Sequence, residues 1–451
     1  MDFKNILWLK KVEETNSTQE KKVEDLFEVV KKDNIPKLEK KVTGNSDMSL
    51  WKYSSWDDKH RIVELVNDIF LNALRLMASD IHIEPREKNL KVRFRVDWFF
   101  IKYKDFKINK KEGIIARIKI LAYLRIDEHR QPQDWKINYK LFGWKSVDMR
   151  VSVIPTIYGE KCVIRLLKKD EKPPKLKSLW IMPYNMVRIK RHLKDSYWMI
   201  LAVWPTGSWK STTLFAMLSQ FNPEEKNIST LEDPVEYRIK WVNHTQIQPA
   251  IDFTFAKWLR SLLRQDPDII MVWEIRDEET AKLAVEASIT WHIVFSTLHT
   301  NSAVHTIQRL LNLWVDPLLI TSSLKSIISQ RLARKLCIYC KKKYNPWVKI
   351  NKYIYWEVWK YIKNKKDLLL YKPSEWWCEK CNNIWYKGRI GFYEILEITE
   401  WLEKLILQNA SRTQLEIQAI WDWMVTIKED ALLKAVLWET SLEEILSILG
   451  H

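Results

Sequence analysis

The chain has 451 residues, of which 46% are hydrophobic and 29% charged, as in a globular protein of two or three domains. No apolar run approaches the roughly 18 residues of a membrane span, and the N-terminus lacks a signal peptide. We therefore expect a cytoplasmic protein rather than an integral membrane protein. The net charge of +17 is compatible with a nucleic acid or an anionic membrane surface as partner. The lysines are spread along the chain, however, and a Lys-rich composition explains the charge without either partner.

The counts of tryptophan and glycine are both unusual, at 25 and 8. A chain of this length normally carries roughly 32 glycines, at about 7% of residues, and adding 25 to 8 gives 33. Glycine supplies the positive φ angles of turns at little steric cost. Some bacteria read the codon UGA as glycine, whereas other translation tables print it as tryptophan. We therefore interpret most of the tryptophans as glycines, the alternative being a protein that is truly rich in tryptophan.

The first part of the chain predicts a tail and an α+β domain. Residues 1–50 are rich in Lys and Glu and poor in apolar residues, which indicates a flexible tail. Apolar residues recur at helical spacing over 62–77, and a second helix is expected over 114–124. Alternating apolar residues predict strands, for example at 147–153. We expect this domain to span residues 57–168, followed by a linker rich in Lys and Pro.

The rest of the chain predicts three further regions. Strand and helix patterns alternate over 178–336, which indicates a parallel sheet covered by helices. Residues 337–394 contain two cysteine pairs around a stretch rich in Lys and Tyr. Residues 395–451 have a mostly helical pattern. The predicted fold class is therefore α/β, preceded by a smaller α+β domain.

The most informative chemical motif follows an apolar strand and precedes a helical pattern. With glycine at two of its tryptophan positions it becomes GPTGSGKST, a phosphate-binding loop in its strand–loop–helix setting. Backbone N–H groups of such a loop close around the phosphates of ATP, and a Cβ at the glycine positions blocks that approach. We expect Lys210 to reach the β- and γ-phosphates and the Ser211 hydroxyl to bind Mg²⁺. The predicted nucleotide-binding residues are Trp204, Pro205, Thr206, Gly207, Ser208, Trp209, Lys210, Ser211 and Thr212.

Two acidic positions follow apolar strands, at the end where open α/β sheets place ligand-binding groups. Glu274 follows the apolar run that ends at Val272 and is the candidate for activating the attacking water. Glu232 begins a second acidic cluster, 232–236, which could contact Mg²⁺ through water or position the nucleophile. The alternative for this second cluster is a helix cap and turn.

Four of the five cysteines form two CxxC pairs. Two such pairs predict a structural Zn²⁺ site with four thiolate ligands, and a disulfide framework is not expected in the cytoplasm. All four thiolates are used for coordination, so we expect the metal to hold a subdomain together rather than to catalyse. The expected ligands are Cys337, Cys340, Cys378 and Cys381.

Several sequence blocks resemble the secretion ATPase superfamily, which powers type II secretion and type IV pilus assembly. They are the phosphate-binding loop, TLEDPVEY (230–237), LRQDPDIIMVWEIRD (263–277) and TWHIVFSTLHTNSA (290–303). The resemblance extends over about residues 57–450. In block after block a tryptophan stands where the superfamily has glycine, which supports the glycine interpretation. These positions include Trp98, Trp135, Trp204, Trp209, Trp241, Trp258, Trp273, Trp291, Trp314 and Trp385.

The resemblance implies a RecA-like P-loop ATPase domain with a zinc-binding insertion and a helical C-terminal end. It also implies that Glu274 is the catalytic carboxylate. His299, with His292 as a second candidate, is implied to couple the γ-phosphate to subunit movement. Arg93 and Arg95 are candidates for cationic groups that close on the triphosphate. The implied cofactors are ATP, Mg²⁺ and Zn²⁺.

The resemblance further implies a homo-hexamer at the cytoplasmic face of the inner membrane. There the hexamer would be peripheral to the bilayer and would drive a platform protein of the inner membrane. No nucleic acid is expected as a partner. The tetracysteine module favours the assembly type of motor over the retraction type, and we favour type IV pilus assembly over type II secretion. Two alternatives stay open. One is an ATPase of DNA uptake or nucleic-acid translocation, which the positive charge suggests, and the other is a non-hydrolysing scaffold if the tryptophans are real.

Overall fold

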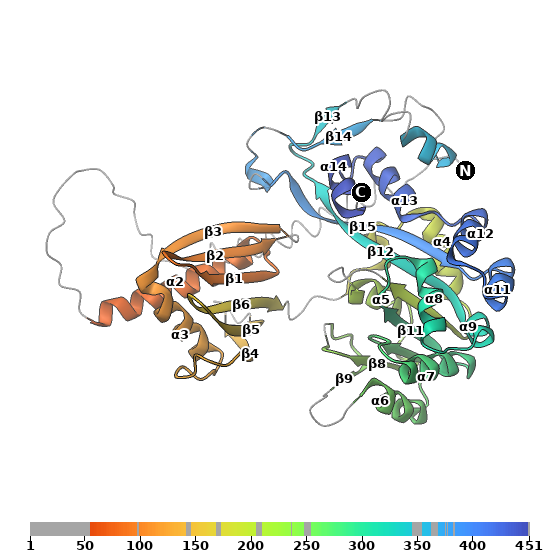
Figure 1. Ribbon diagram of the computed structural model, residues 1–451, viewed down its shortest axis with the longest axis horizontal. Coiled ribbons are helices and arrows are strands. Elements are labelled where there is room, and N and C mark those ends of the chain that lie inside the picture. The colour runs from red at the N-terminus through yellow and green to blue at the C-terminus, as the bar shows by residue number, and fades with distance from the viewer. Residues whose placement is uncertain are drawn as a thin grey trace. The chain divides into compact units, whose positions relative to one another are not determined.

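The computed structural model divides the chain into two compact units, Met1–Lys169 and Asp170–His451 (Figure 1). The predicted tail and residues 204–209 of the predicted phosphate-binding loop lie outside the described residues. The structure describes residues 55–96, 99–140, 146–167, 173–203, 210–235, 237–247, 254–344, 354–361, 369–374, 376, 378–381 and 384–449.

The first unit packs two helices on an antiparallel sheet of six strands with the order β3-β2-β1-β6-β5-β4. Apolar residues alternate along the strands, so that Ile81 and Ile83 of β1 are fully buried on one face together with Phe70 from the first helix. The elements are α2 (Ser55–Arg75), β1 (Asp80–Pro85), β2 (Asn89–Val96), β3 (Phe99–Lys107), α3 (Lys111–Leu121), β4 (Gln133–Lys140), β5 (Ser146–Thr156) and β6 (Gly159–Leu167).

The second unit is built on a sheet of seven strands with the order β15-β12-β7-β11-β10-β8-β9 (Figure 1). All neighbouring strands from β12 to β9 are parallel, and β15 pairs antiparallel with β12. The strands are β7 (Trp198–Val203), β8 (Ile228–Glu232), β9 (Asn243–Gln246), β10 (Ile269–Val272), β11 (Ile293–Leu298), β12 (Leu324–Leu336) and β15 (Tyr386–Glu397).

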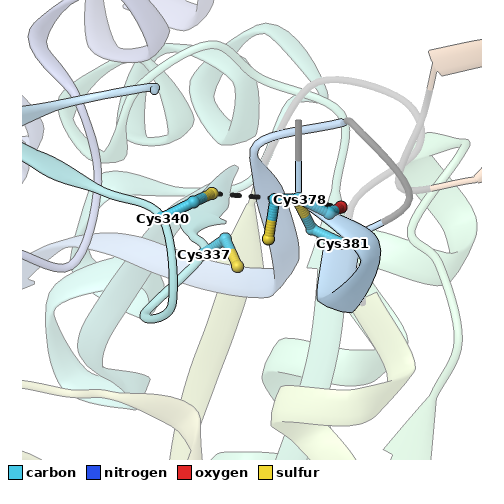
Figure 2. A group of neighbouring side chains, drawn as sticks. All are labelled: Cys337, Cys340, Cys378 and Cys381. Carbon is cyan, nitrogen blue, oxygen red and sulfur yellow. Dashed lines mark hydrogen bonds between the residues drawn. The ribbon is translucent and has the colours of Figure 1, made fainter. Parts of the chain in front are cut away.

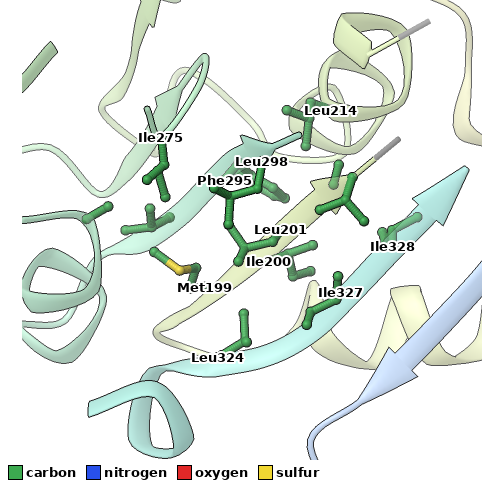
Figure 3. Close-up of a cluster of buried hydrophobic side chains, with 14 of the residues drawn as sticks. Met199, Ile200, Leu201, Leu214, Ile275, Phe295, Leu298, Leu324, Ile327 and Ile328 are labelled. Atoms are coloured by element: carbon green, nitrogen blue, oxygen red, sulfur yellow. The ribbon is translucent and has the colours of Figure 1, made fainter. Parts of the chain in front are cut away.

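The central strands β7, β10 and β11 are buried along their whole length, which explains their nearly continuous apolar sequences. Figure 3 shows Leu201 of β7 and Phe295 of β11 in this core, together with Ile328 of β12. The helices between the strands are α4 (Pro183–His192), α5 (Lys210–Leu218), α6 (Phe255–Leu262), α7 (Glu278–Ile289), α8 (Ala303–Asn312) and α9 (Pro317–Ser323). The prediction of a largely parallel sheet covered by helices is therefore confirmed for this unit.

In the C-terminal part of the second unit, strand β15 joins this sheet, whereas β13 (Lys342–Tyr344) and β14 (Leu370–Lys372) form a separate sheet of two strands. Strand β15 runs across residue 394, where we predicted the end of the cysteine-containing region. Ile390 and Phe392 of β15 pack with the last helices in a second core cluster. The remaining elements are α11 (Glu400–Leu407), α12 (Arg412–Trp421), α13 (Ile427–Val436) and α14 (Leu442–Leu449). Among the described residues, no helix is both long and apolar enough to span a bilayer.

Tryptophan occupies most of the left-handed backbone positions in the described residues. Eleven non-glycine residues have positive φ, and seven of them are tryptophans with φ between 56° and 71°. Four of the seven directly follow the C-cap residue of a helix. The N–H of the next residue then donates to the carbonyl five residues earlier, as that of His292 does to Ala287. This is the Schellman helix end, whose left-handed residue is usually glycine. The four are Trp291, Trp314, Trp423 and Trp438.

We predict that replacing Trp314 or Trp423 with glycine stabilises the printed chain against unfolding. A residue with a Cβ pays roughly 1–2 kcal/mol in left-handed helical conformation, and both indoles are 75% exposed and gain little packing. Denaturant unfolding of the single variants measures the change in free energy. Trp401 is the matched control because it is also exposed but lies inside α11. Trp401→Gly should destabilise by about 1 kcal/mol, and equal effects at all three positions would contradict the prediction.

Candidate functional site

The candidate site lies where the parallel strands β7, β10 and β11 end. Val203 at the end of β7 is in register with Leu298 at the end of β11, and Val272 of β10 is in register with Ser296 of β11. The three strands therefore end at one edge of the sheet, where α/β proteins bind their ligands, and the next segments of the sequence carry the predicted site residues. These segments contain the predicted phosphate-binding loop, Glu274 and His299.

Backbone hydrogen bonds fix Glu274 on both sides. The N–H of Trp273 donates to the carbonyl of Leu231 on β8, over 2.8 Å, and the N–H of Ile275 donates to the carbonyl of Thr297 on β11, over 2.9 Å. The backbone of residues 273–275 is thus bound to β8 on one side and to β11 on the other, the two strands that flank β10. These bonds hold Glu274 at the sheet edge.

The Glu274 carboxylate has a partner at each oxygen. His299 Nε2 lies 2.9 Å from Oε1, and Arg276 Nε donates to Oε2 over 2.9 Å. Arg276 also approaches Asp233 of the second acidic cluster, with 3.6 Å between Nη2 and Oδ2. Glu274 is only 9% exposed, so these contacts determine the direction of its carboxylate. The structure therefore brings together two predicted site residues, Glu274 and His299, and adds Arg276, which the sequence analysis missed.

A cavity of about 380 Å³ opens beside this carboxylate. Among the described residues that line it, Glu274 is the only acidic one, whereas two arginines, Arg276 and Arg309, and two histidines also face it. Such a lining suits a polyanion more than a cation. Arg309 and His305 come from α8, which begins four residues after His299, and Arg309 lies in the last turn of this helix.

Glu232 occupies a different environment from Glu274. It is fully buried, and its Oε1 accepts hydrogen bonds from the Thr230 hydroxyl (2.6 Å) and lies 2.8 Å from His244 Nδ1. It does not line the cavity beside Glu274. The neighbouring residue of its cluster, Asp233, is the one that reaches Arg276. A role for Glu232 in catalysis stays a prediction.

Helix α5 begins at Lys210, within the predicted phosphate-binding motif. The side chains of Lys210 and Ser211 lie outside the described residues, but the next two threonines are buried. The Thr212 hydroxyl lies 3.2 Å from the Tyr237 hydroxyl, and the Thr213 hydroxyl donates to Gln330 of β12 over 2.7 Å. Strand β7 therefore precedes residues 204–209 and helix α5 follows them, in the order that the motif requires.

The remaining predicted residues of the ATP site belong to other segments of the chain. His292 Nδ1 lies 2.9 Å from the carbonyl of Ala287 at the end of α7, and His292 does not line the cavity. Arg93 and Arg95 belong to the first unit, where both guanidinium groups stack over the Phe100 ring at 4.0 and 4.4 Å. Their role toward the phosphates stays a prediction.

An acidic residue holds Arg93 on the strand. Arg93 donates to Glu84 over 2.8 Å. Burial by itself raises the pKa of Glu84, but the hydrogen bond and charge of Arg93, with Lys161 and Arg86, outweigh it and hold this pKa below its usual value. The Arg93 guanidinium is thus positioned by an ionised partner at neutral pH.

The four paired cysteines converge from two distant parts of the second unit. Figure 2 shows the two pairs facing each other, and their Sγ atoms all lie within 4.8 Å of one another. The first pair follows β12, where the N–H of Cys337 donates to the carbonyl of Trp385 and so ties the two turns together. Cys340 Sγ and Cys381 Sγ are 3.8 Å apart, which is about the edge of a tetrahedron with Zn–S bonds of ~2.3 Å. The predicted ligand set therefore fits a tetrahedral metal ion.

Comparisons with known proteins agree with this geometry. The sequence profile of the type II/IV secretion system protein family matches residues 55–447. The type II secretion system ATPase E of Vibrio cholerae is 41% identical over 87% of this chain and 76% of its own length. The type IV pilus assembly ATPase PilB of Myxococcus xanthus is 40% identical over 86% of this chain and 68% of its own length.

Solved structures support the fold. The ATPase DotB of Legionella pneumophila superposes with a TM-score of 0.62 at 18% identity, over 85% of this chain and 94% of DotB. The pilus retraction motor PilT with bound ADP superposes with a TM-score of 0.55 at 23% identity, over 84% of this chain and 95% of PilT. From the profile match and the identities of about 40%, we conclude that the chain belongs to the type II/IV secretion system protein family.

Proposed function

We propose that this protein is an ATPase that drives type IV pilus assembly or type II secretion. The observation that carries the proposal is the buried Glu274 carboxylate, held beside His299 at the sheet edge where β7 leads into the predicted phosphate-binding loop. The relatives at about 40% identity are named as ATPases of both systems, and they do not favour one over the other. We further propose a hexamer at the cytoplasmic face of the inner membrane, acting on a platform protein of that membrane.

The proposed reaction assigns distinct tasks to the residues of the site. Glu274 accepts a proton from the attacking water, because each carboxylate oxygen keeps a lone pair beyond its bond to His299 or Arg276. His299 and Arg276 orient this carboxylate, and Arg309 adds positive charge to the cavity wall. Lys210 holds the β- and γ-phosphates, and Mg²⁺ at Ser211 would neutralise phosphate charge.

This function requires glycine at positions 204 and 209, where an indole would fill the space for the phosphates. We propose that these residues, and most of the 25 tryptophans, are glycine in the native protein. The seven tryptophans in left-handed conformation support the proposal, because glycine is the residue that usually takes this conformation. A chain that is truly rich in tryptophan has no reason to collect it at Schellman helix ends.

We also propose that the cysteine cluster holds one structural Zn²⁺. Three of the four cysteines are buried, and four thiolates leave no open position for a substrate. The ion would tie the end of β12 to the turn before β15. A tetracysteine module favours an assembly motor over a retraction motor within the family.

Replacing Glu274 with glutamine should separate binding from hydrolysis. We expect the Glu274→Gln variant, made in a chain with glycine at 204 and 209, to bind ATP with nearly unchanged affinity. Its turnover should fall by ~10²-fold or more, because the amide cannot accept the proton. Equilibrium ATP binding and phosphate release measure the two effects. The control is Glu278→Gln, which removes an exposed carboxylate paired with Lys282 and should leave turnover unchanged; hydrolysis by Glu274→Gln at the rate of this control would refute the assignment.

Removing one cysteine of the cluster should remove the metal. We expect about one Zn²⁺ per chain in freshly purified, reduced protein, and none in Cys378→Ser, because three thiolates bind zinc more weakly than four. Elemental analysis measures the content. Cys162→Ala is the matched control, since Cys162 is the one remaining cysteine and is buried in β6. Zinc retained by Cys378→Ser, or absent from the unmodified protein, would contradict the proposal.

A further inference from the structure

Glu394 of β15 is a buried carboxylate that two helices share. It is 7% exposed, and none of the ion pairs of the described residues includes it. Its Oε1 accepts the N–H of Ala303 over 3.0 Å, and its Oε2 accepts the N–H of Ile427 over 3.4 Å. These are the first residues of α8 and α13, so one side chain joins the N-termini of two helices that are far apart in the sequence.

The caps of both helices leave the N–H groups of Ala303 and Ile427 free to donate to Glu394. The first N–H groups of a helix have no partner within the helix. The Ser302 hydroxyl caps α8 by accepting from His305, and Thr426 with Glu429 forms a capping box on α13. The caps do not use the N–H groups of the first helical residues. Burial raises the pKa of Glu394, whereas the two N–H donors at the helix N-termini and the charge of Arg331 oppose this rise.

One of the two helices leads directly to the proposed ATP site. His299, which contacts Glu274, is three residues before the cap of α8. The Thr300 hydroxyl lies 2.7 Å from the Thr306 hydroxyl, which also donates to the carbonyl of Ser302. A shift of the His299 segment would therefore move the start of α8.

The other helix leads into the C-terminal core. Asp430 of α13 accepts the N–H of Tyr393, which precedes Glu394 on β15, over 2.8 Å. The buried ammonium group of Lys434 lies 2.6 Å from the same carboxylate oxygen. Helix α13 is thus fastened to the strand that carries Glu394, next to α14 and the end of the chain.

We propose that Glu394 is a positioning residue that couples the His299 segment of the ATP site to helix α13. The proposal rests on the function proposed above. A buried carboxylate that loses a donor finds no water to replace it, so the two helix N-termini should respond together when nucleotide binds. The coupling passes through Oε1 to Ala303 and through Oε2 to Ile427.

Hydrogen–deuterium exchange tests the coupling in the full chain with glycine at 204 and 209. A non-hydrolysable ATP analogue should slow amide exchange in peptides covering 293–303 and also in peptides covering 427–436. In Glu394→Gln the amide nitrogen cannot accept the second N–H. We expect this variant to keep the response of 293–303 and to lose at least half of the response of 427–436. Its turnover should fall while its KM for ATP stays within about 2-fold, a split that general unfolding would not produce.

A second variant removes a donor instead of the acceptor. Ala303→Pro deletes one N–H at the first helical position, where proline is tolerated, and Ser302 before it already has an extended conformation. It should also uncouple 427–436. The control is Glu397→Gln on the same strand, because Glu397 pairs with Arg188, Arg191 and His192 of α4. It should keep both responses.

The outcomes distinguish this inference from the function on which it rests. If the analogue slows exchange at 293–303 but not at 427–436 in the chain with Glu394, the coupling is refuted and the ATPase proposal stands. A full response of 427–436 in both Glu394→Gln and Ala303→Pro also refutes the coupling. If the analogue does not bind and changes neither region, the proposed function fails, and the inference fails with it.

Discussion

The site depends on the backbone hydrogen bonds that hold Glu274 between two parallel strands. The N–H groups on either side of this residue are bound to β8 and β11. A buried parallel sheet of nearly continuous apolar strands is therefore what aims the carboxylate, and His299 and Arg276 complete its orientation. Strand β7, which precedes the proposed phosphate-binding loop in the sequence, ends at the same sheet edge.

A second constraint acts on the backbone. A phosphate-binding loop needs N–H groups that point at the ligand without a Cβ in the way, and a Schellman helix end needs a residue that accepts positive φ. Both requirements indicate glycine at positions where the given sequence has tryptophan. The requirement at Trp291 or Trp438 comes from the helix geometry alone, and it agrees with the requirement that the motif chemistry imposes at Trp204 and Trp209.

Short motifs allowed much of the site to be predicted, because the residues of a motif follow strands that end at one edge. Glu274 and His299 were predicted separately and lie 2.9 Å apart. The cysteine spacing likewise predicted a cluster that the structure brings within 4.8 Å. Glu394 was missed because its contacts depend on how distant segments pack, whereas Arg276 was missed although it lies only two residues after Glu274. The pairing of β15 with β12 is one such case, and no local pattern marks it. The two N-terminal arginines remain predictions, since their chemistry depends on a nucleotide.

The most direct test compares ATP hydrolysis by two forms of the chain, one as printed and one with glycine at both 204 and 209. The account predicts steady turnover only in the glycine form, because only that loop can close its N–H groups around the phosphates. Both forms should contain the same folded sheet, which circular dichroism verifies. Equal turnover by the form with tryptophan at 204 and 209 would contradict the account. So would a folded glycine form that shows no turnover even at protein concentrations high enough for assembly.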